Sequence, residues 1–235
     1  MVSKLEKYIN TEKDLYEMLD NLMINIPWDN FYTERTRPAP FLVQNNLPDE
    51  NLVSFINNNS SVKRVIDLGC GEGRNAIYLA QKGIDITAID FSEIAINNAK
   101  IIAQKANVVV NFIADNVLSH DYMNNKYDLV YDSGLFHSLP PHRRLQYLEL
   151  INSLTIDKGY FGLVCFAWGE ECAGESVDDW HFYDKKLAGQ AFKKERLKDF
   201  FSEYFNMIEI RKYKNSIPNT IQGLDFLWIC LFKKK

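Results

Sequence analysis

Hydrophobic residues follow three successive patterns along this 235-residue chain. Over residues 1–23 they recur every three or four positions, which predicts an amphipathic helix. Residues 27–50 hold four of the seven prolines together with several aromatic residues, which predicts irregular chain wrapped over the body of the protein. Residues 51–56 fit a short helix, and the polar run that follows it predicts a turn. From residue 62 onward, short apolar runs alternate with amphipathic helical stretches.

This alternation predicts a doubly wound, mainly parallel α/β sheet, because each parallel connection needs a crossover of about a dozen residues or more. The runs typical of strands are residues 64–68, 85–89, 108–113, 128–131, 160–166, 207–213 and 224–232. The stretches typical of helices are residues 75–82, 92–106, 142–154 and 194–204. Only residues 214–223 separate the last two strands, which is too short for a helical crossover. We therefore expect these two strands to form an antiparallel hairpin that closes the sheet.

Composition narrows the range of functions. The chain length fits one domain, and 27 basic against 31 acidic residues give a net charge of −4, which disfavours nucleic acid or an anionic membrane as partner. The four cysteines are widely spaced and form no C-x-x-C pair, so neither a disulfide framework nor a metal site is predicted, and a cytoplasmic location fits best. No apolar run approaches the roughly 20 residues of a membrane span.

A glycine-rich turn follows the first core strand, in the run VIDLGCGEGRNAIYLA. Glycines at alternate positions let the backbone turn sharply and approach a ligand, and the helix that follows offers unpaired N–H groups at its start. Two acids lie at the ends of the next two strands. Asp90 comes 21 residues after Gly69, where a carboxylate can accept hydrogen bonds from a ribose, and Asp115 follows the third strand. These features together predict a site for a nucleotide-like ligand.

Two alternatives stay open at this point. Each acid can instead be a helix cap or a turn residue, a role that suits Asp115 better than Asp67. A dinucleotide-binding dehydrogenase has a similar layout, but its fingerprint is G-x-G-x-x-G, whereas this chain has G-x-G-x-G and two helical segments before the first strand.

Four motifs in order carry a resemblance to a known family: VIDLGCGEGRNAIYLA, ITAIDFS, IADN and YDLVYDSGLFHSLPPHRR. Together they resemble the class I S-adenosylmethionine-dependent methyltransferases, and most closely the small-molecule branch that includes tellurite-resistance and thiopurine-type enzymes. The resemblance implies a Rossmann-like core over residues 62–235 whose seven strands lie in the order 3-2-1-4-5-7-6 with the seventh antiparallel. Residues 1–61 would then form an N-terminal helical cap and wrap, within a single domain of residues 1–235.

The resemblance also implies roles for individual residues. Asp67 would hold the methionine ammonium of S-adenosylmethionine, Asp90 the ribose hydroxyls, and Phe91 would pack against the adenine. The remaining residues implied for the cofactor, or for its product S-adenosylhomocysteine, are Gly69, Cys70, Gly71 and Arg74 in the glycine loop, Asp115 and Asn116 at the adenine edge, and Asp132 and Ser133 on the methionine side.

Methyl transfer from a sulfonium mainly requires that the nucleophile be positioned and that water be excluded. A general base is needed only where the acceptor must lose a proton. His137, just beyond the fourth strand, is the candidate base because an imidazole titrates near neutral pH. The alternative, that His137 only shapes its loop, stays open.

Two aromatic segments are candidates for the acceptor side. Residues 167–190 follow the fifth strand as a long insertion, which predicts a lid over the acceptor. Alternatively, its aromatic residues only anchor the loop, and Arg37 in the N-terminal segment is only a surface residue. The candidate substrate residues are Trp28, Tyr32 and Arg37 in the N-terminal wrap and Trp168, Trp180, His181 and Tyr183 in the lid. The wrap can also cover the cofactor, with Arg37 available for its methionine carboxylate.

These observations predict a cytoplasmic enzyme that transfers a methyl group from S-adenosylmethionine to a small molecule, as a monomer or homodimer, with no nucleic-acid or membrane partner. Two other hypotheses remain: a regulatory module that binds the cofactor without turnover, and a methyltransferase for RNA or protein.

Overall fold

The structure is a computed structural model, and it describes residues 9–23, 27–34, 46–169 and 178–235. Its strands are β1 (Arg64–Leu68), β2 (Asp85–Asp90), β3 (Asn111–Ala114), β4 (Tyr127–Ser133), β5 (Thr155–Phe166), β6 (Phe205–Lys212) and β7 (Leu227–Lys234). Its helices are α1 (Glu12–Leu22), α2 (Trp28–Glu34), α4 (Glu50–Asn58), α5 (Arg74–Gln81), α6 (Glu93–Lys105), the 3-10 helix η1 (Phe136–Ser138), α7 (Pro141–Leu154), α8 (Asp179–Asp184) and α9 (Lys194–Phe201).

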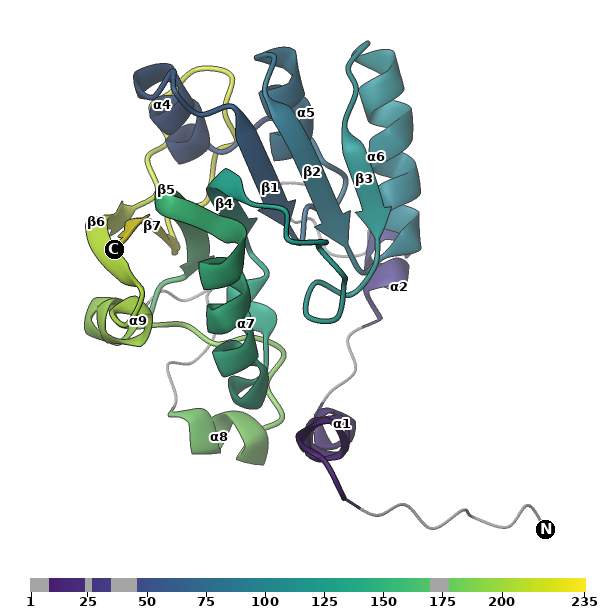
Figure 1. The fold of residues 1–235 in the computed structure, drawn as a ribbon, viewed down its shortest axis with the longest axis vertical. Coiled ribbons are helices and arrows are strands. Elements are labelled where there is room, and N and C mark those ends of the chain that lie inside the picture. Colours follow the sequence, from purple (N-terminus) through teal and green to yellow (C-terminus); the bar gives the residue numbers. More distant parts are fainter. Residues whose placement is uncertain (1–8, 24–26, 35–45, 170–177) are drawn as a thin grey trace, which may run out of the picture.

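The seven strands form one sheet in the order β3-β2-β1-β4-β5-β7-β6, which confirms the predicted α/β fold (Figure 1). The pairs β2–β3, β1–β2, β1–β4 and β4–β5 are parallel. Strand β7 runs antiparallel to both β5 and β6, so the hairpin expected from the short connection is present. The carboxyl ends of the parallel strands therefore meet at one edge, where open α/β sheets bind ligands.

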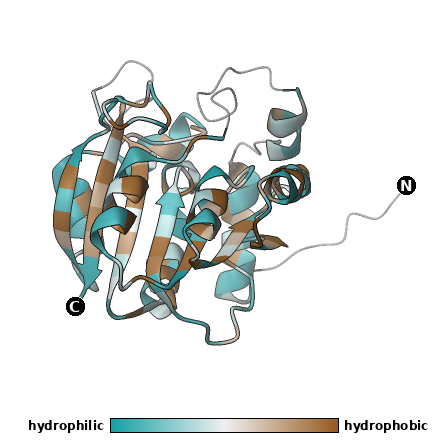
Figure 2. Ribbon diagram, turned by 90° about the horizontal axis from the view of Figure 1, so that it is seen from above, coloured by the Kyte–Doolittle hydropathy of each residue, from teal (hydrophilic) through white to brown (hydrophobic). Residues whose placement is uncertain are grey.

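Helices cover both faces of the sheet, and each face has its own hydrophobic core. On one face, residues of α7 and α9 pack against a group of aromatic rings centred on Phe161 and Phe232. On the other face, α4, α5 and α6 contribute Leu52, Leu79 and Ile96. Hydrophobic residues recur along most of the strands between these two layers (Figure 2). Within the ranges that the structure describes, no helix is long and apolar enough to cross a bilayer.

The segment after Pro27 differs from the prediction. We expected irregular chain, but residues Trp28–Glu34 form α2. Proline lacks an N–H group, which disrupts the interior of a helix but costs nothing before the first turn, and the carbonyl of Pro27 accepts a hydrogen bond from Phe31. The prolines of this segment suggested irregular chain, although Pro27 only precedes the first turn of α2. Helix α4 also continues through Asn58, into part of the segment expected as a turn.

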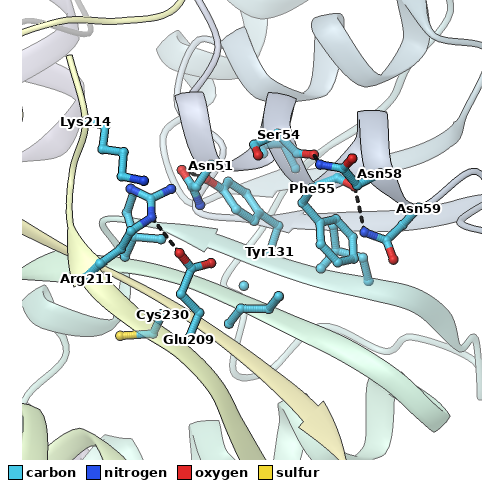
Figure 3. A pocket seen from close by; sticks show the side chains of 15 residues that line it. Asn51, Ser54, Phe55, Asn58, Asn59, Tyr131, Glu209, Arg211, Lys214 and Cys230 are labelled. Atoms are coloured by element: carbon cyan, nitrogen blue, oxygen red, sulfur yellow. Dashed lines mark hydrogen bonds and ion pairs between the residues drawn. The ribbon is translucent and has the colours of Figure 1, made fainter. Parts of the chain in front are cut away.

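A cavity of about 240 Å³ lies between α4 and the strands β4, β5, β7 and β6 (Figure 3). Its lining includes Gly162 of β5 and Tyr131 of β4. A Cβ atom at Gly162 would lie 2.8 Å from Cδ2 of Tyr131, so only glycine lets this ring rest on the neighbouring strand. The Tyr131 hydroxyl then reaches the amino end of α4, where it donates a 2.9 Å hydrogen bond to Asp49.

Candidate functional site

The glycine loop between β1 and α5 is tied to the end of β2. The backbone N–H groups of Gly69 and Cys70 both donate to the carbonyl of Ile89, at 2.8 and 3.0 Å. Gly71 and Gly73 have φ angles of +55° and +78°, in the left-handed region that favours glycine. Helix α5 begins directly after Gly73, so its first turn presents N–H groups beside the loop. The loop predicted from the sequence is therefore a sharp backbone turn at the ligand-binding edge of the sheet.

Asp90, the last residue of β2, fixes this loop by accepting backbone hydrogen bonds. Its two carboxylate oxygens accept hydrogen bonds from the N–H groups of Gly71, at 2.8 Å, and Ser92, at 2.9 Å. Burial raises the pKa of Asp90, against these two hydrogen bonds, which lower it. Each oxygen keeps a further lone pair, so Asp90 can also accept hydrogen bonds from ligand hydroxyls. The neighbouring Phe91 is 68% exposed.

Asp67, in β1, differs from Asp90 because one of its carboxylate oxygens has no hydrogen-bond partner among the described residues. It is 1% exposed, and its Oδ2 atom is buried with no hydrogen-bond partner. The pKa of Asp67 is raised to about 8, mainly by burial; the charge of Arg74 opposes the rise, and the nearby carboxylates of Asp49 and Asp132 add to it. A buried carboxylate that lacks a partner is costly unless a ligand supplies a positive charge or a hydrogen-bond donor.

Asp132 is engaged by its own loop. Its carboxylate accepts hydrogen bonds from the N–H groups of Gly134, Leu135 and Phe136, at 2.8 to 3.0 Å, and from the hydroxyl of Tyr147 at 2.6 Å. Asp132 therefore shapes the turn after β4, and its contact with the methionine part of the cofactor stays a prediction. The next residue, Ser133, accepts a 3.0 Å hydrogen bond from Arg74.

Asp115 and Asn116, after β3, both make turn contacts. Asp115 accepts a 2.7 Å hydrogen bond from the N–H of Asn116 and lies 2.8 Å from Nδ1 of His120. The His120 interaction is the main reason why the pKa of Asp115 is lowered. The side chain of Asn116 caps the N–H of Leu118. The turn interpretation thus describes the contacts seen, and their role toward an adenine stays a prediction.

Helix α2 lies over the glycine loop, as expected for a wrap that covers the cofactor, and its contact with an acceptor stays a prediction. The Tyr32 hydroxyl is so close to Gly71 that a Cβ atom there would lie 2.7 Å from it. Asp29 accepts a 2.5 Å hydrogen bond from the Ser92 hydroxyl, which fastens α2 to the start of α6. Trp28 packs in the same small cluster. Tyr32 therefore lies beside the cofactor residues, and Arg37 lies outside the described residues.

His137 lies in the loop after β4, close to the glycine loop through Leu135, whose Cβ would be 2.9 Å from a Cβ at Gly69. Its half-buried ring stacks on Phe166, with 3.7 Å between the ring centroids, and its Nδ1 atom is buried with no hydrogen-bond partner. Burial, and secondarily the charge of Arg144, lower the pKa of His137 well below its usual value. The imidazole is therefore neutral near pH 7, and such a lowered pKa makes it a weak general base.

The described part of the predicted lid contains α8, which begins at Asp179. Residues 170–177 lie outside the described residues. Trp180 is 83% exposed and Trp168 is 48% exposed, with the ammonium of Lys193 4.5 Å from the Trp168 ring centroid. His181 pairs with Asp178 at 3.2 Å. The structure thus does not bring Trp180 or His181 together with His137.

Tyr183 anchors α8 to the start of α7. Its hydroxyl accepts a 3.1 Å hydrogen bond from the backbone N–H of His142 and lies 2.8 Å from Nδ1 of the same residue. The other ring nitrogen of His142 lies 2.8 Å from Asp20 of α1. Tyr183 therefore joins two covering helices through α7, and its contact with an acceptor stays a prediction.

A buried polar cluster around Asp49 was not predicted. Asp49 is 0% exposed and binds the guanidinium of Arg74 through both oxygens, at 2.8 and 3.1 Å. It also accepts hydrogen bonds from the side chains of Asn75 (2.9 Å), Tyr131 (2.9 Å) and Tyr213 (3.3 Å). The only available sequence signal was an acid before the helix at residues 51–56, which is the ordinary position of a helix cap.

Comparison with known proteins places the chain in a family. Residues 59–212, well over half of the chain, match the family model described as a methyltransferase domain. A 2-heptyl-1-hydroxyquinolin-4(1H)-one methyltransferase from Mycobacteroides abscessus is 30% identical over 105 residues, which are 44% of this chain and 46% of that protein. The probable S-adenosyl-L-methionine-dependent methyltransferase TehB from Haemophilus influenzae is 26% identical over 135 residues, 52% of this chain and 47% of TehB.

The chain thus spans about half the length of these curated relatives. Among solved structures, 1,6-didemethyltoxoflavin-N1-methyltransferase from Burkholderia thailandensis has the same fold, with a TM-score of 0.64 at 16% identity over 98% of this chain and 92% of that one. The chain therefore belongs to the methyltransferase-domain family, and its resemblance to the class I S-adenosylmethionine-dependent methyltransferases is confirmed.

Proposed function

We propose that the protein transfers a methyl group from S-adenosylmethionine to a small-molecule acceptor. The observation that carries this proposal is the buried, unpartnered Oδ2 atom of Asp67 beside the glycine loop. A ligand with an ammonium group next to a nucleoside would satisfy Asp67 and the lone pairs of Asp90 at the same time. S-adenosylmethionine has both groups and carries its methyl group on an electrophilic sulfonium.

Within this proposal each residue has a physical task. Asp67 holds the ammonium, Asp90 the ribose, and the backbone from Gly69 to Gly71 lines the ligand. Tyr32, which covers Gly71, excludes water from the cofactor side. Because Asp49 and Arg74 neutralise each other, Asp67 supplies the negative charge that a cationic ligand needs.

The acceptor is proposed to be small and planar. Relatives named for a hydroxyquinolone and for didemethyltoxoflavin support a small-molecule acceptor, and the stacked rings of His137 and Phe166 offer a flat aromatic surface near the glycine loop. We further propose a cytoplasmic protein with a single domain, a monomer or homodimer, in which α1, α2 and α8 cover the site.

A panel assay tests the proposal. We expect calorimetry to show micromolar-range binding of S-adenosylhomocysteine, and methylated product with at least one member of a panel of thiol, amine, hydroxyl, halide and metalloid acceptors. Absence of binding would contradict the proposal. Binding without product across the panel would favour a regulatory module, and retention on RNA at physiological salt would favour a nucleic-acid substrate.

Replacing His137 with phenylalanine is expected to lower kcat/KM for the acceptor by about tenfold to a hundredfold, since the buried Nδ1 atom, which has no partner among the residues that the structure describes, is the group proposed to hydrogen-bond the acceptor. Phenylalanine keeps the stacking on Phe166 but removes both ring nitrogens. Because the pKa of His137 is lowered, we expect no inflection from this residue between pH 6 and 8 in the wild-type rate. Steady-state kinetics with the best acceptor measures both effects.

The affinity of the His137→Phe variant for S-adenosylhomocysteine is the control and should not change. An unaltered kcat/KM would leave His137 with a loop-shaping role only.

A further inference from the structure

The buried cluster that joins α4, α5, β4 and the end of β6 lies directly behind the proposed cofactor site. Its two charged members are Asp49 and Arg74, and Arg74 reaches beyond the pair to the hydroxyl of Ser133 at the end of β4. Arg74 is also the main charge that lowers the pKa of Asp67. Two carboxylates, Asp49 and Asp67, therefore compete for one guanidinium.

The structure shows which carboxylate has the guanidinium. Arg74 binds Asp49 through both terminal nitrogens, the bidentate geometry that makes an arginine–carboxylate pair strong. Asp67 and Arg74 both lie in the described part of the chain, and no ion pair joins them, while Oδ2 of Asp67 is unpartnered. Asn75, Tyr131 and Tyr213 fix the orientation of the Asp49 carboxylate by donating to it.

The charge state of Asp49 agrees with this arrangement. Burial by itself raises the pKa of Asp49, but the charge of Arg74 and the hydrogen bonds outweigh burial and lower it. Asp49 and Arg74 are therefore both ionised, and the net charge of the pair is zero. One tyrosine donor, Tyr131, lies on β4 and the other, Tyr213, directly follows β6. Tyr131 also lines the cavity under α4, close to Asn51 (Figure 3).

We propose that Asp49 is a positioning residue of the cofactor site: it holds the Arg74 guanidinium away from Asp67, so that the Asp67 carboxylate remains available to a ligand ammonium. Without the negative charge at position 49, the buried guanidinium would take Asp67 as its partner. The ligand ammonium would then have to displace an arginine that is already inside the protein. This inference rests on the proposed cofactor, but its electrostatic part concerns the unliganded protein alone.

The first test needs no ligand. Carbon-13 labelling of aspartate carboxyl groups, with the Asp67 signal assigned through an Asp67→Asn variant, gives the pKa of Asp67 by NMR titration. In Asp49→Asn we expect this pKa to fall by about one unit or more, partly because the repelling charge of Asp49 is gone and partly because the Arg74 guanidinium comes close. Adding Arg74→Gln should raise it again. An Asp67 pKa that does not move in Asp49→Asn would overturn the proposal.

The second test compares two ligands by calorimetry: S-adenosylhomocysteine and its analogue without the α-amino group. In Asp49→Asn we expect about tenfold or more weaker binding of S-adenosylhomocysteine, which corresponds to one pKa unit of lost interaction, but less than about threefold for the deaminated analogue. The double variant with Arg74→Gln should recover part of the loss. Equal weakening for both ligands would show that Asp49 only supports the loop.

Glu50→Gln is the matched control. Glu50 is the neighbouring residue, is equally buried, and forms its own two-point ion pair with Arg211, away from Asp67. We expect it to lower stability without changing the preference between the two ligands.

If Asp49→Asn does not fold, Arg74→Lys serves instead, because a lysine ammonium cannot make the two-point pair, so Asp49 holds the charge at position 74 less firmly away from Asp67. The same selective loss of S-adenosylhomocysteine binding is then expected, and its absence would count against the proposal. If the wild-type protein bound neither ligand, the proposed cofactor would be wrong, and the NMR titration would still decide whether Asp49 shields Asp67.

Discussion

At pH 8 the unliganded Asp67→Asn variant is expected to unfold at a temperature about 5 °C or more above that of the wild-type protein, given about 2–4 °C per kcal/mol for a chain of this size. Burial is the main reason why the pKa of Asp67 is raised from 3.8 to about 8. Between these two values the folded protein keeps a proton that the unfolded chain releases. Each pH unit in that window lowers the stability by up to about 1.4 kcal/mol, and asparagine removes this loss.

Thermal unfolding at pH 5, 6.5 and 8 measures the effect. The stability difference between variant and wild type should be small at pH 5 and grow as the pH rises toward 8. Asp115→Asn is the control, because this exposed acid has a lowered rather than a raised pKa. A gain that is equally large at pH 5 and pH 8 would mean that packing, and not ionisation, explains the result.

The same substitution should abolish the ligand response. S-adenosylhomocysteine is expected to raise the unfolding temperature of the wild-type protein but not that of Asp67→Asn, since the variant offers no charge to the ammonium. In the wild-type protein, affinity should increase from pH 6 to about pH 8, as Asp67 loses its proton; above that, the amino group of the ligand begins to lose its own. At position 67, asparagine is therefore expected to favour stability, whereas aspartate is expected to favour ligand binding.

Asp90→Ala is expected to weaken S-adenosylhomocysteine binding by about a hundredfold or more and to lower stability by about 2–4 kcal/mol. The substitution leaves the N–H groups of Gly71 and Ser92 without their acceptor, and each unpaired buried group costs about 1–3 kcal/mol. It also removes the acceptor proposed for the ribose. Calorimetry with S-adenosylhomocysteine and chemical unfolding measure the two losses.

Asp85→Ala is the matched control, because Asp85 begins the same strand and pairs with Arg64 at the exposed, opposite edge of the sheet. Its effect on both quantities should be slight. Binding of the Asp90→Ala protein within about threefold of wild type would show that Asp90 does not contact the ligand.

The sheet could be predicted because its signals are local. Each strand is a short apolar run, each crossover is an amphipathic stretch, and the short connection between β6 and β7 leaves only a hairpin. Strand boundaries were harder to predict. Strand β5 begins at Thr155, whereas we expected residue 160, because most of its first residues are polar and the pairing is irregular between Tyr127 and Leu129. The glycine loop and Asp90 were equally visible, since both lie at strand ends.

The cluster around Asp49 could not be predicted in the same way. Its members come from residues 49, 74, 75, 131 and 213, and only the folded sheet brings them together. Tyr131 looks like an ordinary strand residue, and Arg74 like a ligand contact. The direction of the Asp132 side chain could not be predicted either, because its partners are backbone N–H groups of a turn that the sequence does not specify.

The absence of a side chain at Gly162 also links this position to Tyr131 during evolution. While Tyr131 is present, even an alanine at 162 would place its methyl carbon 2.8 Å from the tyrosine ring. A larger residue at 162 therefore requires that the tyrosine ring shift or be replaced, and either change disturbs a donor to Asp49. These two positions should consequently diverge as a linked pair among descendants of this sequence.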